Sequence, residues 1–80
     1  MNEGDIVRLK QPVRPALNTA RFYLYGIVIK VMATEPDAIA QPAKTEVLVH
    51  LYEPRFNEIY VDEQGVQAIY CFRKDELEVN

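Results

Sequence analysis

The chain of 80 residues contains one cysteine, Cys71, one histidine, His50, and no tryptophan. A single cysteine cannot form an intramolecular disulfide, and with one histidine it cannot complete a structural zinc site. Glycine-rich phosphate-binding loops and nucleophile motifs are missing as well. Cys71 lies between Tyr70 and Phe72 in an apolar stretch, where a free cysteine behaves as a small hydrophobe. We therefore expect a protein that folds through its core alone, is not an enzyme, and holds no metal or other cofactor.

Long apolar runs are also absent from the sequence. The longest, residues 22–31, is interrupted by Lys30 and falls short of the roughly 18 residues that a membrane helix needs. Residues 1–5 carry two acids and lack the basic and apolar regions of a signal peptide. Together with the lone cysteine, these features predict a cytoplasmic protein without a membrane segment.

Size and composition favour one small globular domain that spans residues 1–80. The chain has a mass of 9.2 kDa, 49% hydrophobic residues, 26% charged residues and a formal net charge of -3. This apolar fraction argues against intrinsic disorder. A chain of this size buries only about 60% of the surface that its unfolded form exposes, so few side chains remain for an elaborate site.

Hydrophobic periodicity predicts a series of strands. In the first, Val7 and Leu9 alternate with Arg8 and Lys10, which is the pattern of a half-buried strand. The second is dense in aromatic and β-branched residues, and Gly26 within it predicts a bend or a bulge. The expected strands are residues 6–10, 22–32, 45–52, 58–61 and 66–72, followed by a short last strand at 78–79.

Turn-forming residues separate these strands. Two prolines fall in each of the segments 11–21 and 33–44, and we expect a loop in both. Gly65 closes a turn at 62–65 that predicts a hairpin between the strands on either side. Residues 73–77 are too few for a stable helix and suit a 3-10 turn before the last strand.

Five to six short strands with almost no helix predict an all-β fold. Eighty residues cannot supply the two full sheets of a seven-stranded sandwich, and closure into a barrel removes exposed strand edges. The order of strands, long loops and a 3-10 turn before the last strand is typical of a small SH3-like barrel. We predict this fold, and an OB-type barrel is the alternative.

Charge is distributed unevenly along the chain. Between Asp5 and Glu35 there is no acidic residue and there are five basic ones, whereas residues 45–80 carry eight acids and three bases. One interpretation is a solvated basic rim without a partner. The other is a docking surface for an acidic protein, in which charge complementarity speeds and orients association. The residues that we assign to this surface are Arg8, Lys10, Arg14 and Arg21.

Aromatic residues offer a second set of candidates. Tyr23 and Tyr25 share a strand face with apolar residues and are expected in the core or at its rim. Tyr52 and Tyr60 are expected at the surface, where they would join the basic residues in contacting a partner. Exposed rings beside basic side chains also suit RNA or ribosome association, although the acidic second half of the chain disfavours it. Homo-oligomerisation through an apolar edge is a third alternative.

The two ends of the chain resemble a known family. Residues 1–9, MNEGDIVRL, and residues 72–79, FRKDELEV, are together similar to the variable subunit of ferredoxin–thioredoxin reductase, and Val47, Leu48 and Val49 look like its central strand. That family comprises small SH3-like barrels of cyanobacteria and plastids, which are non-catalytic and pack against an iron–sulfur subunit. The resemblance implies an accessory protein, within a wider group of cyanobacterial barrels of which some dock the acidic protein ferredoxin.

Overall fold

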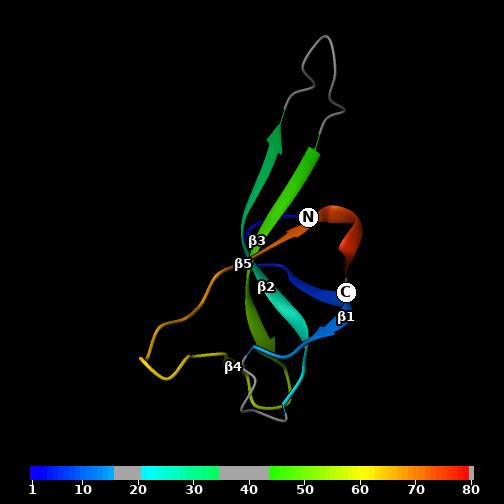
Figure 1. Cartoon of the computed structure of the whole chain (residues 1–80). Helices are drawn as coiled ribbons and strands as arrows, with labels where there is room; N and C mark the ends of the chain where they lie inside the picture. Colours follow the sequence, from blue (N-terminus) through cyan, green and yellow to red (C-terminus); the bar gives the residue numbers. More distant parts are fainter. Residues whose placement is uncertain (16–20, 35–43, 80) are drawn as a thin grey trace.

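A computed structural model describes residues 1–15, 21–34 and 44–79 of the chain (Figure 1). The predicted fold class is confirmed, because the described chain is nearly all β, its six strands form one antiparallel sheet, and a 3-10 turn precedes the last strand. No helix in these residues has the length and apolar character needed to cross a membrane. The elements are β1 (Ile6–Val13), β2 (Tyr23–Thr34), β3 (Lys44–Glu53), β4 (Glu58–Ile59), β5 (Tyr70–Arg73), η1 (Lys74–Glu76) and β6 (Leu77–Val79).

The sheet is curled so that its two edges approach each other. Its strand order is β4-β3-β2-β1-β6, and β5 also pairs with β3. The chain thus leaves β5 at the β3 edge, passes through the three residues of η1, and enters β6 at the β1 edge. Because three residues span only a short distance, and because η1 contacts both β1 and β3, the sheet wraps around a single core.

The core is built from the inward-facing residues of four strands. On β3 the alternating residues Val47, Val49 and Leu51 are completely buried, as the period-2 pattern predicts. Each fully buried side chain of this size contributes about 1.5–3 kcal/mol relative to an exposed position. The buried cluster consists of Val7, Leu9, Tyr23, Val28, Val47, Val49, Leu51 and Leu77.

The first strand is longer than expected. β1 continues to Val13 and includes Pro12, which we had assigned to a loop. The extension is tolerated because the pairing with β2 shifts between Arg8 and Val13, so that proline occupies a position where no ladder hydrogen bond is required. The remaining part of this predicted loop, at 16–20, and most of the second, at 35–43, lie outside the described residues.

The predicted hairpin between residues 58–61 and 66–72 is wrong in its pairing, although its turn is present. Gly65 has a left-handed φ of 82°, and the Asp62 carboxylate accepts hydrogen bonds from the backbone N–H groups of Gln64 and Val66. However, β4 and β5 do not pair with each other. They pair with separate stretches of β3, because this long strand offers both of them backbone partners and a buried apolar face.

Gly26 serves close packing and is not the site of a bulge, which was one of the two features predicted for it. It is in regular register with Val7 on β1 and Leu51 on β3, and the irregularity in β2 falls between Val28 and Lys30. A Cβ atom at position 26 would lie 3.1 Å from Val49 Cγ2 and 3.3 Å from the backbone oxygen of His50. The absence of a side chain therefore lets β2 pack tightly against β3.

We expect Gly26→Ala to lower the free energy of unfolding by about 1–3 kcal/mol, because the added methyl group overpacks the β2–β3 contact. Urea denaturation followed by circular dichroism measures the change. Val49→Ala removes the nearest atom, Val49 Cγ2, so the double variant should lose less stability than the sum of the single losses. Additive losses, or a stabilised Gly26→Ala variant, would contradict the packing role.

Candidate functional site

Two of the predicted basic residues lie along β1. Arg8 and Lys10 are exposed and alternate with buried Val7 and Leu9. Arg8 is in register with Tyr25 on β2 and with Glu78 on β6, so a carboxylate residue is its neighbour on the same face. These two residues therefore form a line along the exposed face of β1.

The other two predicted basic residues lie against aromatic rings. The guanidinium carbon of Arg14 is 5.9 Å from the ring centroid of Phe22. The guanidinium carbon of Arg21 is 5.2 Å from the ring of Tyr23 and 5.5 Å from that of Phe56. A cation over an aromatic face is attracted by the quadrupole of the ring. Arg14 and Arg21 thus lie over the adjacent residues Phe22 and Tyr23, where β2 begins.

A buried carboxylate joins this cluster to the core. Glu53 is 9% exposed, and its Oε1 accepts a hydrogen bond of 2.5 Å from Nε of Arg55. Its Oε1 also forms ion pairs with the Nη2 atoms of Arg55 and Arg21, the latter at 3.9 Å. One carboxylate therefore faces two guanidinium groups. The sequence contains a signal for the burial of Glu53. This residue lies two positions after buried Leu51 and four after buried Val49, on the same face of β3.

The turn after Glu53 presents an aromatic ring to solvent. Pro54 begins the turn, and the backbone N–H of Phe56 donates to the Glu53 carbonyl at 3.3 Å. Asn57 adopts a left-handed φ of 51°, and its Oδ1 accepts a hydrogen bond of 2.5 Å from the Tyr52 hydroxyl. These local bonds fix the turn, and as a result Phe56 remains 61% exposed.

The tyrosines that we assigned to the surface contribute mainly to packing. Tyr52 is only 7% exposed, which corrects its predicted position, because the turn that its hydroxyl holds folds against it. Tyr60 is half-buried, and its ring meets that of Tyr23 edge to face at 5.6 Å. Tyr23 is buried in the core, as expected. The partner-binding role of Tyr60 stays a prediction.

Sequence reasoning missed three residues that the structure adds to the basic side chains. Phe22, Arg55 and Phe56 stand in two Arg-Phe dipeptides, 21–22 and 55–56, and this repeated pair is a signal that the sequence contained. Phe22 is 55% exposed despite its apolar ring. We call the set the arginine–phenylalanine surface, and it consists of Arg14, Arg21, Phe22, Arg55 and Phe56.

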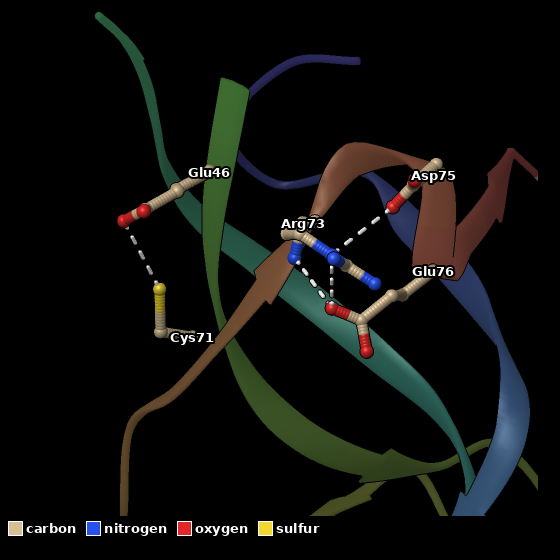
Figure 2. Close-up of polar contacts among 5 residues, drawn as sticks. All are labelled: Glu46, Cys71, Arg73, Asp75 and Glu76. Carbon is tan, nitrogen blue, oxygen red and sulfur yellow. Dashed lines mark hydrogen bonds and ion pairs between the residues drawn. The ribbon is translucent and has the colours of Figure 1, made fainter. Parts of the chain in front are cut away.

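Cys71 is exposed, and it does not act as the buried hydrophobe that we expected. It points away from the core because Tyr70 and Phe72 occupy the half-buried positions of β5. Partial desolvation and a hydrogen bond from its Sγ to Glu46 Oε2, at 3.5 Å, raise the pKa of the thiol above its ordinary value (Figure 2). Among the described residues, no three His, Cys, Asp or Glu side chains gather in a way that would hold a metal ion.

Comparison of the chain with protein-family models, curated proteins and solved structures found no match. None of these comparisons bears on the resemblance to the variable subunit of ferredoxin–thioredoxin reductase, which stays a prediction. The function must therefore be inferred from the geometry of the chain itself.

We expect Glu53→Gln to lower the free energy of unfolding by about 1–2 kcal/mol, because two guanidinium groups would lose their shared charged acceptor. Urea denaturation measures the loss, and Glu3→Gln at an exposed position is the matched control, with a change within about 0.5 kcal/mol. Equal stability of the two variants would show that Glu53 does not anchor the cluster.

The raised pKa of Cys71 predicts a sluggish thiol. Because only the thiolate is nucleophilic, reaction with Ellman's reagent at mildly alkaline pH should be slower than for free cysteine and should accelerate at higher pH. Glu46→Gln removes the neighbouring carboxylate, so it should lower the pKa of the thiol and raise the rate. Glu58→Gln, which changes an exposed carboxylate on β4, should leave the rate unchanged. A rate that is insensitive to Glu46→Gln would refute the contribution that we assign to Glu46.

Proposed function

We propose that this chain is a non-enzymatic binding module that docks an acidic protein through the arginine–phenylalanine surface. The observation that carries the proposal is the pair of exposed rings, Phe22 at 55% and Phe56 at 61%, each with a guanidinium group over its face. Aromatic and arginine side chains are enriched at the energetic centres of protein interfaces. Exposed rings that are grouped with arginine side chains are typical of an interaction surface, whereas single exposed apolar residues are common on any protein.

Several features favour an acidic partner. Arg14, Arg21 and Arg55 bring three guanidinium groups to this surface, and Glu53 supplies one carboxylate. The side chain of Arg55 is 73% exposed, so part of its guanidinium group is open to a carboxylate from outside. Arginine binds carboxylates with two parallel hydrogen bonds, and contact with an aromatic face reduces the water that must be removed.

Arg8 and Lys10 act in this proposal as steering charges. They extend the positive potential from the arginine–phenylalanine surface along the exposed face of β1. Such charges raise the rate of association and fix orientation more than they deepen affinity. Glu78, in register with Arg8, weakens this contribution locally, so Lys10 is the more effective of the two.

We also infer that the curled sheet is an SH3-like barrel. The direct path from β5 through η1 to β6, which links the two sheet edges, supports this inference. Together with the resemblance of the chain ends, it favours an accessory subunit of a cytoplasmic, ferredoxin-linked redox complex, since ferredoxin presents an acidic surface. The proposal that the arginine–phenylalanine surface docks an acidic protein does not depend on the identity of this complex.

Single-stranded RNA is the second candidate partner. Phe22 and Phe56 are exposed enough to stack on bases, and the neighbouring arginines would contact phosphates. The eight acids in residues 45–80 oppose a long phosphate backbone, which makes the acidic protein the better choice.

Binding to an acidic, aromatic probe tests the proposal. We expect the chain to bind a labelled random copolymer of glutamate and tyrosine, measured by fluorescence anisotropy. Phe22→Ala combined with Phe56→Ala should weaken binding about tenfold, because the rings are the apolar centre of the contact. Arg14→Glu should also weaken binding of the copolymer. We do not substitute Arg21 or Arg55 in this test, because both form ion pairs with buried Glu53 and their loss would destabilise the fold.

Matched controls change similar residues elsewhere. Val66→Ala combined with Ile69→Ala removes exposed apolar groups, and Lys30→Glu reverses an exposed charge on β2. Both should bind the copolymer as the unchanged chain does. Equal losses in the controls and the surface variants would refute the proposal. Tighter binding to polyuridine, with an affinity that falls linearly in log–log plots against salt, would assign the surface to RNA instead.

A further inference from the structure

The chain between β4 and β5 leaves the sheet and returns to it at almost the same place. The backbone N–H of Tyr60 donates a hydrogen bond of 2.9 Å to the carbonyl oxygen of Leu51, and Tyr70 is in register with Val49 on the same strand. Residues 61–69 therefore start and end beside nearby residues of β3, and Figure 1 shows that they project from the sheet. Surface loops whose ends lie close together are frequently functional. We call this segment the projecting loop.

Hydrogen bonds close the projecting loop on itself and attach it to β3. The backbone N–H of Asp62 donates to the carbonyl oxygen of Val66 at 2.9 Å, and the Asp62 carboxylate accepts bonds from the N–H groups of Gln64 and Val66. His50 Nδ1 donates to the carbonyl oxygen of Ala68 at 3.1 Å. The loop is thus closed through its backbone, and its apolar side chains lie outside the core.

The surface of the projecting loop is both apolar and acidic. Its exposed apolar side chains are those of Val61, Val66 and Ile69. In residues 57–71 there is no lysine or arginine, and the carboxylates are those of Glu58, Asp62 and Glu63. Among the described residues, no ion pair joins Glu58 or Asp62 to a basic side chain. The loop and its base therefore place negative charge beside exposed apolar side chains.

A complementary surface is present on the same chain. The arginine–phenylalanine surface has three guanidinium groups, one neighbouring carboxylate and two exposed rings, those of Phe22 and Phe56. Its basic side chains are complementary in charge to the carboxylates of the loop, and both patches carry exposed apolar groups. Within one copy the loop does not cover these rings, because both remain exposed. A contact between the two patches must therefore join different copies of the chain.

We propose that the projecting loop of one copy docks on the arginine–phenylalanine surface of a second copy. Val66 and Ile69 contact the rings of Phe22 and Phe56, and the carboxylates at the base of the loop face the guanidinium groups. The inference rests on the proposed function, because the loop occupies the site that the acidic partner uses. Self-association therefore regulates access to this surface, and the acidic partner displaces the loop.

The contact is heterologous, because it joins two different patches, and each side can be changed without altering the other. Both patches are small, and interfaces of small area are weak. We therefore expect a Kd on the order of 0.1–1 mM. At low micromolar concentrations of the chain, where the copolymer titration is made, the surface is then free. Val66→Ala combined with Ile69→Ala thus remains a valid control in that titration.

NMR spectra of the ¹⁵N-labelled chain at increasing concentration test the contact. Between about 20 µM and about 2 mM, a range that brackets the expected Kd, we expect shifts of the backbone amides of both patches and slower translational diffusion. Val66→Lys combined with Ile69→Lys, the loop variant, should remove both effects, because it replaces apolar groups with charges that the arginines repel. Phe22→Ala combined with Phe56→Ala, the surface variant, should weaken association about tenfold.

A mixture of the two variants is the sharper measurement. The loop variant keeps an intact surface and the surface variant keeps an intact loop, so together they form the contact that neither forms alone. We expect shifts at residues 14, 21–22 and 55–56 of the ¹⁵N-labelled loop variant when the unlabelled surface variant is added, and at residues 61–69 with the labels exchanged. Asn2→Lys combined with Val79→Lys introduces the same two lysines at other exposed positions and should associate as the unchanged chain does.

The outcomes separate this inference from the proposed function. Copolymer binding without any concentration-dependent shift up to about 2 mM chain, or self-association that the loop variant retains, would overturn the inference and leave the proposed function standing. Association restored in the mixture supports it, as does reversal of the loop shifts when the copolymer is added. Association through both patches in a chain that does not bind the copolymer would support the self-contact and overturn the acidic partner.

Discussion

The buried face of β3 is the constraint on which the rest of the structure depends. Val47, Val49 and Leu51 are completely buried, and β3 pairs with β2 along one edge and with β4 and β5 along the other. A chain of 80 residues has room for one core only, so a single strand must serve as the partner of three others. The close approach at Gly26 follows from the same requirement, because β2 must lie tightly against this strand.

The alternation that builds the core also places the candidate site at its end. Glu53 continues the buried parity of β3, and a buried carboxylate must be paired with charged hydrogen-bond donors. Arg21 and Arg55 supply them, and their guanidinium groups in turn lie over Phe56. The exposed ring of Phe56 is therefore linked to the core through one carboxylate.

Much of the fold follows from local pattern. The alternation of residues 45–51 and the turn at Gly65 agree with the sequence-based prediction, because both depend on neighbours in sequence. The predicted hairpin after β4 does not form, because β4 and β5 each pair with the long strand β3 and not with each other. Tyr52 was misplaced for a similar reason, since the turn that covers it is formed by Asn57 and not by a strand.

The sequence alone determined the all-β class, the 3-10 turn before the last strand, and the separation of a basic first part from an acidic second part. These properties depend on composition and on periods of a few residues. Only the tertiary structure decided that Arg14 and Arg21 meet exposed rings while Arg8 and Lys10 follow β1, and that residues 61–69 project from the sheet. Pairing between strands joins residues that are distant in the chain, and such contacts leave no period in the sequence.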